Sequence, residues 1–162
     1  MGQKELLNVM KVSTWLAPVA TTTWTADIAA VVNVDTLGYE STMFIVSTGE
    51  MGATDVIIQM WDSAASGAEG ASGAAVCVPE DVEFAVESNT AANLAEYVTV
   101  AAASQTLTLA AANSDNRCFI FAYHGNKRYV RLHITSAGSV AGIAGILVIQ
   151  DNAKRAPYHT TK

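Results

Sequence analysis

The chain of 162 residues has the length of one ordinary domain, so a single core can organise it and no second domain is expected. Hydrophobic residues make up 51% and charged residues only 15%, against about 25% charged residues in typical globular proteins, which favours a subunit of an assembly over an isolated monomer. The net charge of −6 argues against a nucleic-acid partner, and no run approaches the roughly 20 apolar residues that span a membrane. Since no secretion signal is recognisable, we expect a cytoplasmic protein.

The first third of the chain contains a turn and two segments rich in β-branched residues. Residues 1–20 include Pro18, which cannot donate to a central ladder, so we expect an N-terminal arm or an edge strand there. A turn at residues 37–41 precedes residues 42–48, and residues 55–62 alternate with both faces partly covered. We expect these two strands to form a hairpin.

Apolar and polar residues continue to alternate in several segments of the middle and the end of the chain. Residues 63–75 are small, without periodicity, and are expected to form a surface loop. Residues 82–87 place apolar side chains on one face and mainly acids on the other, and residues 97–100 and 105–109 repeat the pattern. Residues 143–149 are apolar on both faces, which indicates a central strand or an interface and predicts a dimer or trimer.

The longest alternating pattern lies just before that last strand. Residues 118–124 and 128–135 flank a Gly-Asn pair, which is a hairpin signal because Gly125 accepts the positive φ of a tight turn. In that register Phe121 lies opposite Val130, and both face the core. We therefore expect a rigid two-stranded hairpin whose other face is displayed to a partner.

Counting these segments gives about eight or nine short strands and no helix. The prediction is an all-β fold, a two-sheet antiparallel β-sandwich of jelly-roll type, with a closed barrel as the alternative. The sandwich is expected to span residues 21–152, followed by a basic C-terminal tail at residues 153–162.

Charge is distributed unevenly along this fold. Residues 1–116 hold two bases and fourteen acids, a balance of −12, whereas residues 117–162 hold seven bases and one acid, a balance of +6. Such a division indicates complementary charge between subunits, or between this chain and an acidic partner. The alternative is that folding mixes the charges of the two parts, and the sequence leaves both open.

The predicted binding surface combines the outer face of the hairpin with the basic end of the chain. Tyr129, Arg131 and His133 occupy the outer face of the hairpin. Arg131 is expected to be buried in an ion pair, either with a partner or with a neighbouring strand of its own sheet. The predicted interface residues are Lys127, Arg128, Tyr129, Arg131, Lys154 and Arg155.

Groups that carry catalysis or bind cofactors are sparse. His124, His133 and His159 lack metal-ligand spacing, and the glycines of residues 67–73 lack the Lys of a phosphate loop. The two cysteines are far apart in the sequence and are expected to be buried and reduced. We expect a protein without enzymatic activity, cofactor or metal.

Several segments resemble a family of small tailed-phage virion proteins, in the order that the family shows. They are Leu37-Gly-Tyr-Glu-Ser41, the acidic turn Trp61-Asp-Ser63, Gly125-Asn-Lys-Arg-Tyr-Val-Arg131 and Ala156-Pro157. The resemblance covers residues 12–63 and 117–157, whereas residues 64–116 depart from the family pattern.

The resemblance implies a virion component of the cement or decoration kind, bound to the major capsid protein and to further copies of itself. Its place would be the outer surface of a phage capsid assembled in the cytoplasm of the host bacterium. One alternative is a head-tail joining or tail structural protein. Another is a carbohydrate-binding module, with an aromatic cleft built from Trp15, Trp24 or Trp61.

Overall fold

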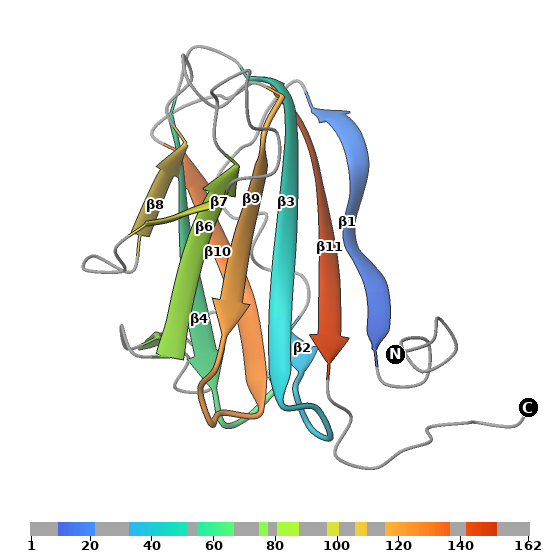
Figure 1. Ribbon diagram of the computed structural model, residues 1–162, viewed down its shortest axis with the longest axis vertical. Coiled ribbons are helices and arrows are strands. Elements are labelled where there is room, and N and C mark those ends of the chain that lie inside the picture. The colour runs from blue at the N-terminus through green and yellow to red at the C-terminus, as the bar shows by residue number, and fades with distance from the viewer. Residues whose placement is uncertain are drawn as a thin grey trace, which may run out of the picture.

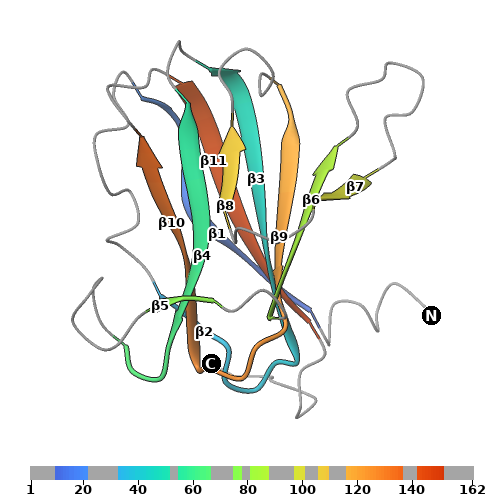
Figure 2. The same cartoon turned by 90° about the vertical axis from the view of Figure 1, so that its left-hand side faces the viewer.

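Two antiparallel β-sheets pack against each other in the computed structural model of the protein (Figure 1). The structure describes residues 10–21, 33–51, 55–66, 75–77, 81–87, 97–100, 106–109, 116–136 and 142–151. Figure 2 turns the molecule so that β10 and β4 lie on one side and β3, β9 and β6 on the other. Within these ranges no helix has the length and apolar character needed to cross a membrane.

The strand order confirms the predicted all-β sandwich. Sheet A has six strands, in the order β1 (Lys11–Thr21), β11 (Gly142–Asp151), β3 (Ser41–Met51), β9 (Cys118–Tyr123), β6 (Val82–Glu87) and β7 (Tyr97–Val100). Sheet B has five, in the order β2 (Val34–Asp35), β10 (Tyr129–Ser136), β4 (Val56–Ser63) and β5 (Ala75–Val76), with β8 (Thr106–Leu109) also paired to β4. The described strands exceed the predicted eight or nine because β2 and β5 contain only two residues each.

Strand pairing is nested along the chain. β1 pairs with β11, β2 with β10, β3 with β9 and β4 with β8, so early strands pair with late ones. Most successive strands therefore pass from one sheet to the other, which is the jelly-roll arrangement. Each of these four ladders joins segments that lie far apart in the sequence.

Period-two alternation decides which side chains form the core. Phe44, Phe121 and Ile146 are fully buried on the inward face of sheet A, and burying each such side chain contributes about 1.5 to 3 kcal/mol. The rings of Phe84 and Phe121 meet edge to face, with centroids 5.0 Å apart. Sheet B contributes the buried residues Val56, Ile58, Met60, Leu109, Val130, Leu132 and Ile134.

Both predicted hairpins are wrong. Phe121 of β9 pairs with Phe44 in sheet A, whereas Val130 of β10 pairs with Asp62 in sheet B. The strands β3 and β4 are likewise divided between the two sheets. The physical reason is burial, because two strands with apolar inward faces cover each other when they lie in opposite sheets across the core.

Gly125 therefore lies in a crossover between the sheets, at residues 124–128, and not in a tight turn. Of the glycines that the structure describes, Gly38 has the positive φ, at 93°. A Cβ at Gly125 would overlap the ring and hydroxyl of Tyr123. The glycine is thus needed for space rather than for backbone conformation.

The two strands at one side of sheet A differ in exposure and regularity. β11 lies between β1 and β3, as its apolar faces predicted, and Leu147 on its outward face is 41% exposed. β1 is the edge strand, with register irregularities between Thr14 and Leu16 and between Leu16 and Val19. A proline and bulges in an edge strand hinder pairing with another chain, and β1 contains Pro18.

Candidate binding surface

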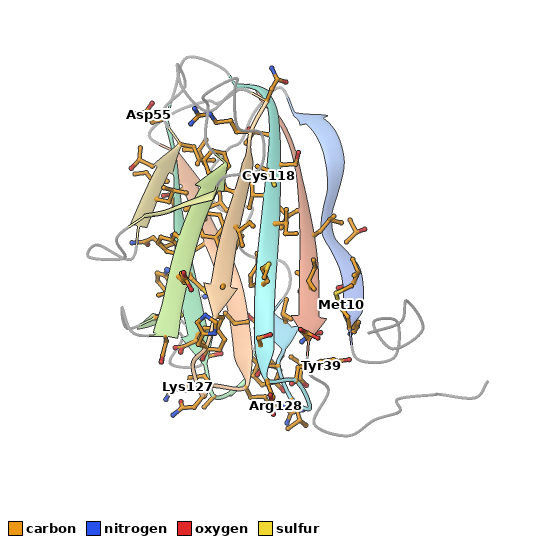
Figure 3. The ribbon with its side chains drawn as sticks, viewed as in Figure 1. Met10, Tyr39, Asp55, Cys118, Lys127 and Arg128 are labelled. Carbon is orange, nitrogen blue, oxygen red and sulfur yellow. The ribbon has the colours of Figure 1, made fainter. Side chains whose placement is uncertain are left out.

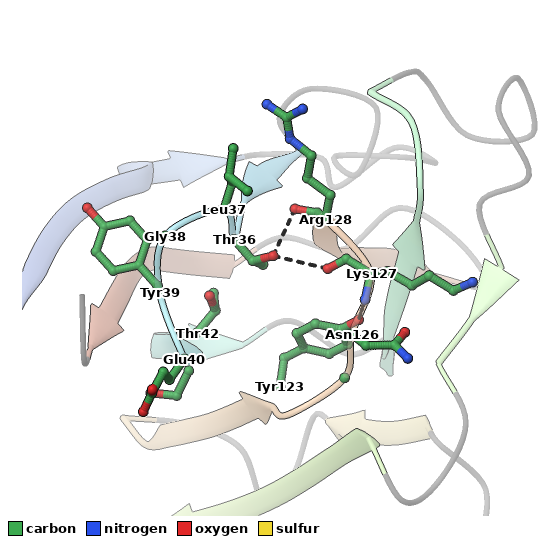
Figure 4. Close-up of a pocket in the computed structure, with 12 residues that line it drawn as sticks. Thr36, Leu37, Gly38, Tyr39, Glu40, Thr42, Tyr123, Asn126, Lys127 and Arg128 are labelled. Atoms are coloured by element: carbon green, nitrogen blue, oxygen red, sulfur yellow. Dashed lines mark hydrogen bonds between the residues drawn. The ribbon is translucent and has the colours of Figure 1, made fainter. Parts of the chain in front are cut away.

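Two segments that are distant in the sequence meet at one end of the sandwich (Figure 4). They are the turn at residues 36–40, which leads into β3, and the crossover at residues 124–128; together they are the end surface. The Thr36 N–H donates to the Arg128 carbonyl at 2.8 Å, and Thr36 Oγ1 lies 3.0 Å from the carbonyl oxygens of both Lys127 and Arg128. These contacts fix the turn against the crossover.

The turn is also held by its own hydrogen bonds. The Leu37 N–H donates to Asp35 Oδ1 at 2.9 Å, and the Tyr39 N–H donates to the Thr36 carbonyl at 3.0 Å. Gly38 adopts the left-handed conformation without strain. The turn presents Leu37 outward, with 65% of its surface exposed. An apolar side chain on a rigid turn costs little conformational entropy to bind.

Arg128 and Asp35 form a bidentate ion pair beside the turn. Arg128 Nε lies 3.1 Å from Asp35 Oδ1, and Arg128 Nη2 lies 2.9 Å from Asp35 Oδ2. The hydrogen bond from Arg128 lowers the pKa of Asp35 below its ordinary value of 3.8, and the same bond raises the pKa of Arg128. The pair joins the acidic and the basic parts of the chain, so folding mixes their charges at this place.

Polar side chains close the core beneath the end surface. Gln150, Thr42 and Tyr123 are in register across β11, β3 and β9, and all three are buried. Gln150 Nε2 donates to the Asp35 carbonyl at 2.7 Å. This layer therefore links sheet A to the first strand of sheet B.

Tyr123 makes a second link between the sheets. Its hydroxyl donates to Asp62 Oδ2 of β4 at 3.0 Å and accepts the Lys127 N–H at 3.0 Å. Burial raises the pKa of the Asp62 carboxyl above 3.8, while the hydrogen bond from Tyr123 acts in the opposite direction. Burial also raises the pKa of the Tyr123 hydroxyl, so it remains a donor at neutral pH.

A pocket of about 280 Å³ lies between the two segments of the end surface. Its lining includes Tyr39, Glu40, Thr42 and Tyr123, and Figure 4 shows Thr42 between the turn and Tyr123. Thr42 is 1% exposed, and its hydroxyl has no hydrogen-bond partner among the residues that the structure describes. A buried hydroxyl in this state is stabilised by a polar group that enters the pocket.

The predicted interface residues separate into four groups, of which buried Arg131 is described in the next paragraph. Lys127 and Arg128 are exposed at the end surface, near Tyr39 and far from Asp55 (Figure 3). Tyr129 is half-buried, with the Arg128 guanidinium 5.1 Å from its ring centroid. Lys154 and Arg155 lie outside the described residues.

Arg131, in contrast to the exposed cations, is 2% exposed, and His133 beside it is 8% exposed. Both are on the outer face of sheet B, where the Arg131 guanidinium lies 5.6 Å from the centroid of the Trp61 ring. The rings of Trp61 and His133 are 4.8 Å apart. Arg131 is thus buried, as expected, in a cation–π contact with Trp61 of its own chain. His133, which was expected on a displayed face, is buried beside the same ring.

The packing of Trp61 argues against its use in the alternative, a carbohydrate-binding cleft. Trp61 is held between neighbours, and its Nε1 donates to Gln59 Oε1 at 3.4 Å, so its ring is not an open platform. Trp24 and the side chain of Trp15 lie outside what the structure describes.

Titratable groups elsewhere are scattered. Cys77 and Cys118 are free thiols; Cys77 is buried, which raises its pKa, but Cys118 is only half-buried, contrary to expectation. His124 Nε2 lies 3.8 Å from Glu83 Oε2 on the surface. Across the described ranges, no group of three or more His, Cys, Asp or Glu side chains could hold a metal ion.

The outer face of sheet A carries two cross-strand rows of mainly apolar side chains. One row runs through Val12, Ile149, Met43 and Ala122, and the next through Thr14, Leu147, Ile45 and Ile120. These residues alternate with the buried core residues, and Val12 and Leu147 are 53% and 41% exposed. Figure 1 looks onto this face, with β11, β3 and β9 in front of β10 and β4.

Sequence reasoning did not identify several residues of the end surface. Thr36, Asp35 and Thr42 were not singled out, and Tyr123 was treated only as part of a strand. The spacing Asp35-Thr36-Leu37 is a signal for an Asx turn. No local signal indicates that Tyr123 lies under residues 125–128, because that contact depends on the crossover.

Comparisons with known proteins give limited likeness. No protein-family model matches the chain, and no curated protein does. A crystal structure of SPBc2 prophage-derived protein YomS is similar with a TM-score of 0.45 and 9% identity, covering 88% of this chain and 94% of that chain. The coat protein of Tobacco streak virus is similar with a TM-score of 0.21 and 12% identity, covering 95% of this chain and 94% of the other. Because both TM-scores lie below 0.5, we draw no conclusion from them.

Proposed function

We propose that this protein is a non-catalytic structural component of a phage virion, which binds the outer surface of the capsid and stabilises it as a cement or decoration protein. The observation that carries the proposal is the meeting of residues 37–41 with residues 125–128. These segments belong to two motifs of the resemblance to tailed-phage virion proteins, and Thr36 joins them at the end surface through hydrogen bonds to Lys127 and Arg128.

The exposed chemistry of the molecule suits adhesion to another protein. The end surface combines exposed Leu37 with exposed Lys127 and Arg128, and the outer face of sheet A adds a second apolar area. Apolar contacts supply affinity, while rim charges set encounter rate and register. The partner proposed for these surfaces is the major capsid protein, together with neighbouring copies of this chain.

The test starts from purified particles of a phage that encodes this chain. Electron microscopy with the chain labelled is expected to place it over the whole capsid surface, and quantitative mass spectrometry is expected to give hundreds of copies. Particles that lack the chain are expected to release DNA at a lower temperature than complete particles. Absence of the chain from particles would contradict the proposal.

Copy number and position on the particle also distinguish the alternative of a head-tail joining or tail protein. A joining ring has closed symmetry, so about six to twelve copies at a single vertex would indicate a joining protein and not a decoration protein. Copies along the tail would indicate a tail protein. Both of these outcomes would overturn the capsid-surface assignment.

A further inference from the structure

Three buried polar side chains lie next to one another across sheet A beneath the end surface, and they differ in their hydrogen bonds. Gln150 donates to the Asp35 carbonyl, and the Tyr123 hydroxyl donates to Asp62. Thr42, the middle one, is 1% exposed, and its hydroxyl has no hydrogen-bond partner among the described residues. Figure 4 shows this side chain between the turn and Tyr123, in the pocket of the end surface. A hydroxyl can both donate to and accept from a group that enters the pocket.

A threonine at this position is unfavourable in the free chain. Burial removes the hydroxyl from water, and no described residue replaces the lost hydrogen bonds. Valine has nearly the same shape without the hydroxyl, and Val46, on the same inward face of β3, is fully buried. A polar partner supplied from outside the chain therefore accounts for the threonine at residue 42.

The charges around the pocket are balanced. Lys127 and Glu40 line it with one exposed charge of each sign, and Arg128 is already paired with Asp35. An ion that reached Thr42 would lose its hydration without meeting an excess of opposite charge. The site therefore suits an uncharged group that has both a donor and an acceptor, and side-chain amides and hydroxyls have this chemistry.

The size of the pocket and its surroundings favour a protein side chain over a free small molecule. Pockets for drug-sized ligands have volumes of about 300 to 1,000 Å³, and this one has about 280 Å³. Leu37, which lines the same pocket, is 65% exposed on a turn that is held by hydrogen bonds. An apolar anchor among exposed polar groups is typical of protein interfaces. Because Thr42 is buried, an amide side chain reaches it better than the shorter side chain of serine.

We propose that the protein partner of the end surface inserts the amide side chain of an Asn or Gln into this pocket, where the amide forms a hydrogen bond with the Thr42 hydroxyl. The inference rests on the proposed function and adds the chemical group that the partner supplies. Leu37 and Lys127 contact the partner around the inserted side chain. The amide is thus the central polar contact, and the exposed groups form the rim of the interface.

The first experiment uses purified protein and three small probes of the same shape. Acetamide, acetate and acetamidinium carry charges of zero, minus one and plus one. In an NMR titration, acetamide is expected to give saturable shifts of the backbone signals of residues 36–42 and 123–128, at lower concentration than either ion. Thr42→Val is expected to weaken acetamide binding roughly threefold to tenfold, as for the loss of one hydrogen bond. Preference for either ion, or no saturable response, would overturn the inference.

The same variant makes a second prediction for the free chain. Because Thr42→Val removes a buried hydroxyl that lacks a described partner, its urea midpoint is expected to equal or exceed that of the wild-type chain. Thr108→Val, the same change at an exposed position of sheet B, is the matched control and should alter neither the midpoint nor acetamide binding. A lower midpoint for Thr42→Val alone would mean that the hydroxyl is already satisfied in the free chain, and the inference would be wrong.

The final experiment adds purified variants to phage particles that lack the chain. Thr42→Val is expected to bind these particles roughly threefold to tenfold more weakly than the wild-type chain, whereas Thr108→Val binds them equally well. Equal binding by Thr42→Val and the wild-type chain would overturn the amide contact and leave the capsid role intact. A wild-type chain that does not bind the particles would overturn the capsid role and, with it, the partner inferred here.

Discussion

The outer faces of the two sheets contrast in composition and exposure. On sheet A, apolar side chains such as Leu147 and Val12 face outward and are substantially exposed. On sheet B, Arg131 and His133 occupy the corresponding outward positions and are almost completely buried. The usual relation between polarity and exposure is thus reversed on both faces.

This contrast teaches that alternation identifies the two faces of a strand without identifying which face is covered. In β10 the pattern separated Val130 and Leu132 from Arg131 and His133 correctly. It could not show that Arg131 packs over Trp61, because Trp61 belongs to a strand about seventy residues earlier. Substitutions on the two faces test the reversal directly.

The largest effect is expected for Arg131→Ala. Removing a fully buried side chain that lies over the Trp61 ring should lower the free energy of unfolding by about 2 to 4 kcal/mol, as for other large-to-small changes in packed sites. Urea denaturation measures it. Arg131→Lys is the matched variant, which keeps the charge but loses the planar contact with Trp61. Its free energy of unfolding should lie between those of the wild-type chain and Arg131→Ala. A loss below about 0.5 kcal/mol for Arg131→Ala would mean that Arg131 is not buried on the outer face of sheet B.

Next in size is Gly125→Ala, in the crossover that joins the two sheets. The added methyl group must displace the Tyr123 ring, which holds Asp62 of the opposite sheet, so a loss of about 1 to 3 kcal/mol in unfolding free energy is expected. Asn126→Ala, at the exposed next position, is the control and should be neutral. Equal urea midpoints for Gly125→Ala and Asn126→Ala would show that a Cβ at residue 125 fits without displacing Tyr123.

A smaller effect is expected for Leu147→Ala on the outer face of sheet A. Because this side chain is already 41% exposed, its truncation should cost about 1 kcal/mol or less in the free chain. This loss of unfolding free energy is to be compared with the larger loss expected for Arg131→Ala. If the leucine variant loses more stability than the arginine variant, the reversal described for the two faces is incorrect.

The smallest effect concerns pH and the link between the sheets. Since burial raises the pKa of Asp62 above 3.8, the folded chain binds more protons than the unfolded chain just above that pH, and stability from this group increases as pH falls into that window. Asp62→Asn should remove this increase while keeping an acceptor for Tyr123. Urea midpoints of both proteins between neutral pH and pH 4 test it, and identical profiles would contradict the shift.

Asp35 acts in the opposite direction at lower pH. Its pKa is lowered by Arg128, so its contribution is present above 3.8 and is lost as pH falls below that value. Measurements for Asp62 must therefore stay above pH 3.8 to separate the two carboxyls.

The fold class followed from the sequence because period two is a local property of each strand. The order of strands did not, since a Gly-Asn pair between two alternating segments is the same signal for a hairpin and for this crossover. Among the candidate residues, exposure of Lys127 and Arg128 was foreseeable from their place beside a turn. The partners of Arg128, Thr36 and Tyr123 depend on strands paired across the whole chain, and no local pattern encodes them.

The nested pairing also imposes an order of events during synthesis. Lys11 of β1 pairs with Gln150 of β11, so β1 leaves the ribosome well before the strand that it pairs with. At about 5 to 20 residues per second that interval is on the order of ten seconds. During it, β1 has not yet acquired its neighbour and both of its edges are available to other nascent chains. Pro18, which cannot donate to a ladder, therefore hinders unwanted pairing of the unfinished chain as well as of the completed sheet.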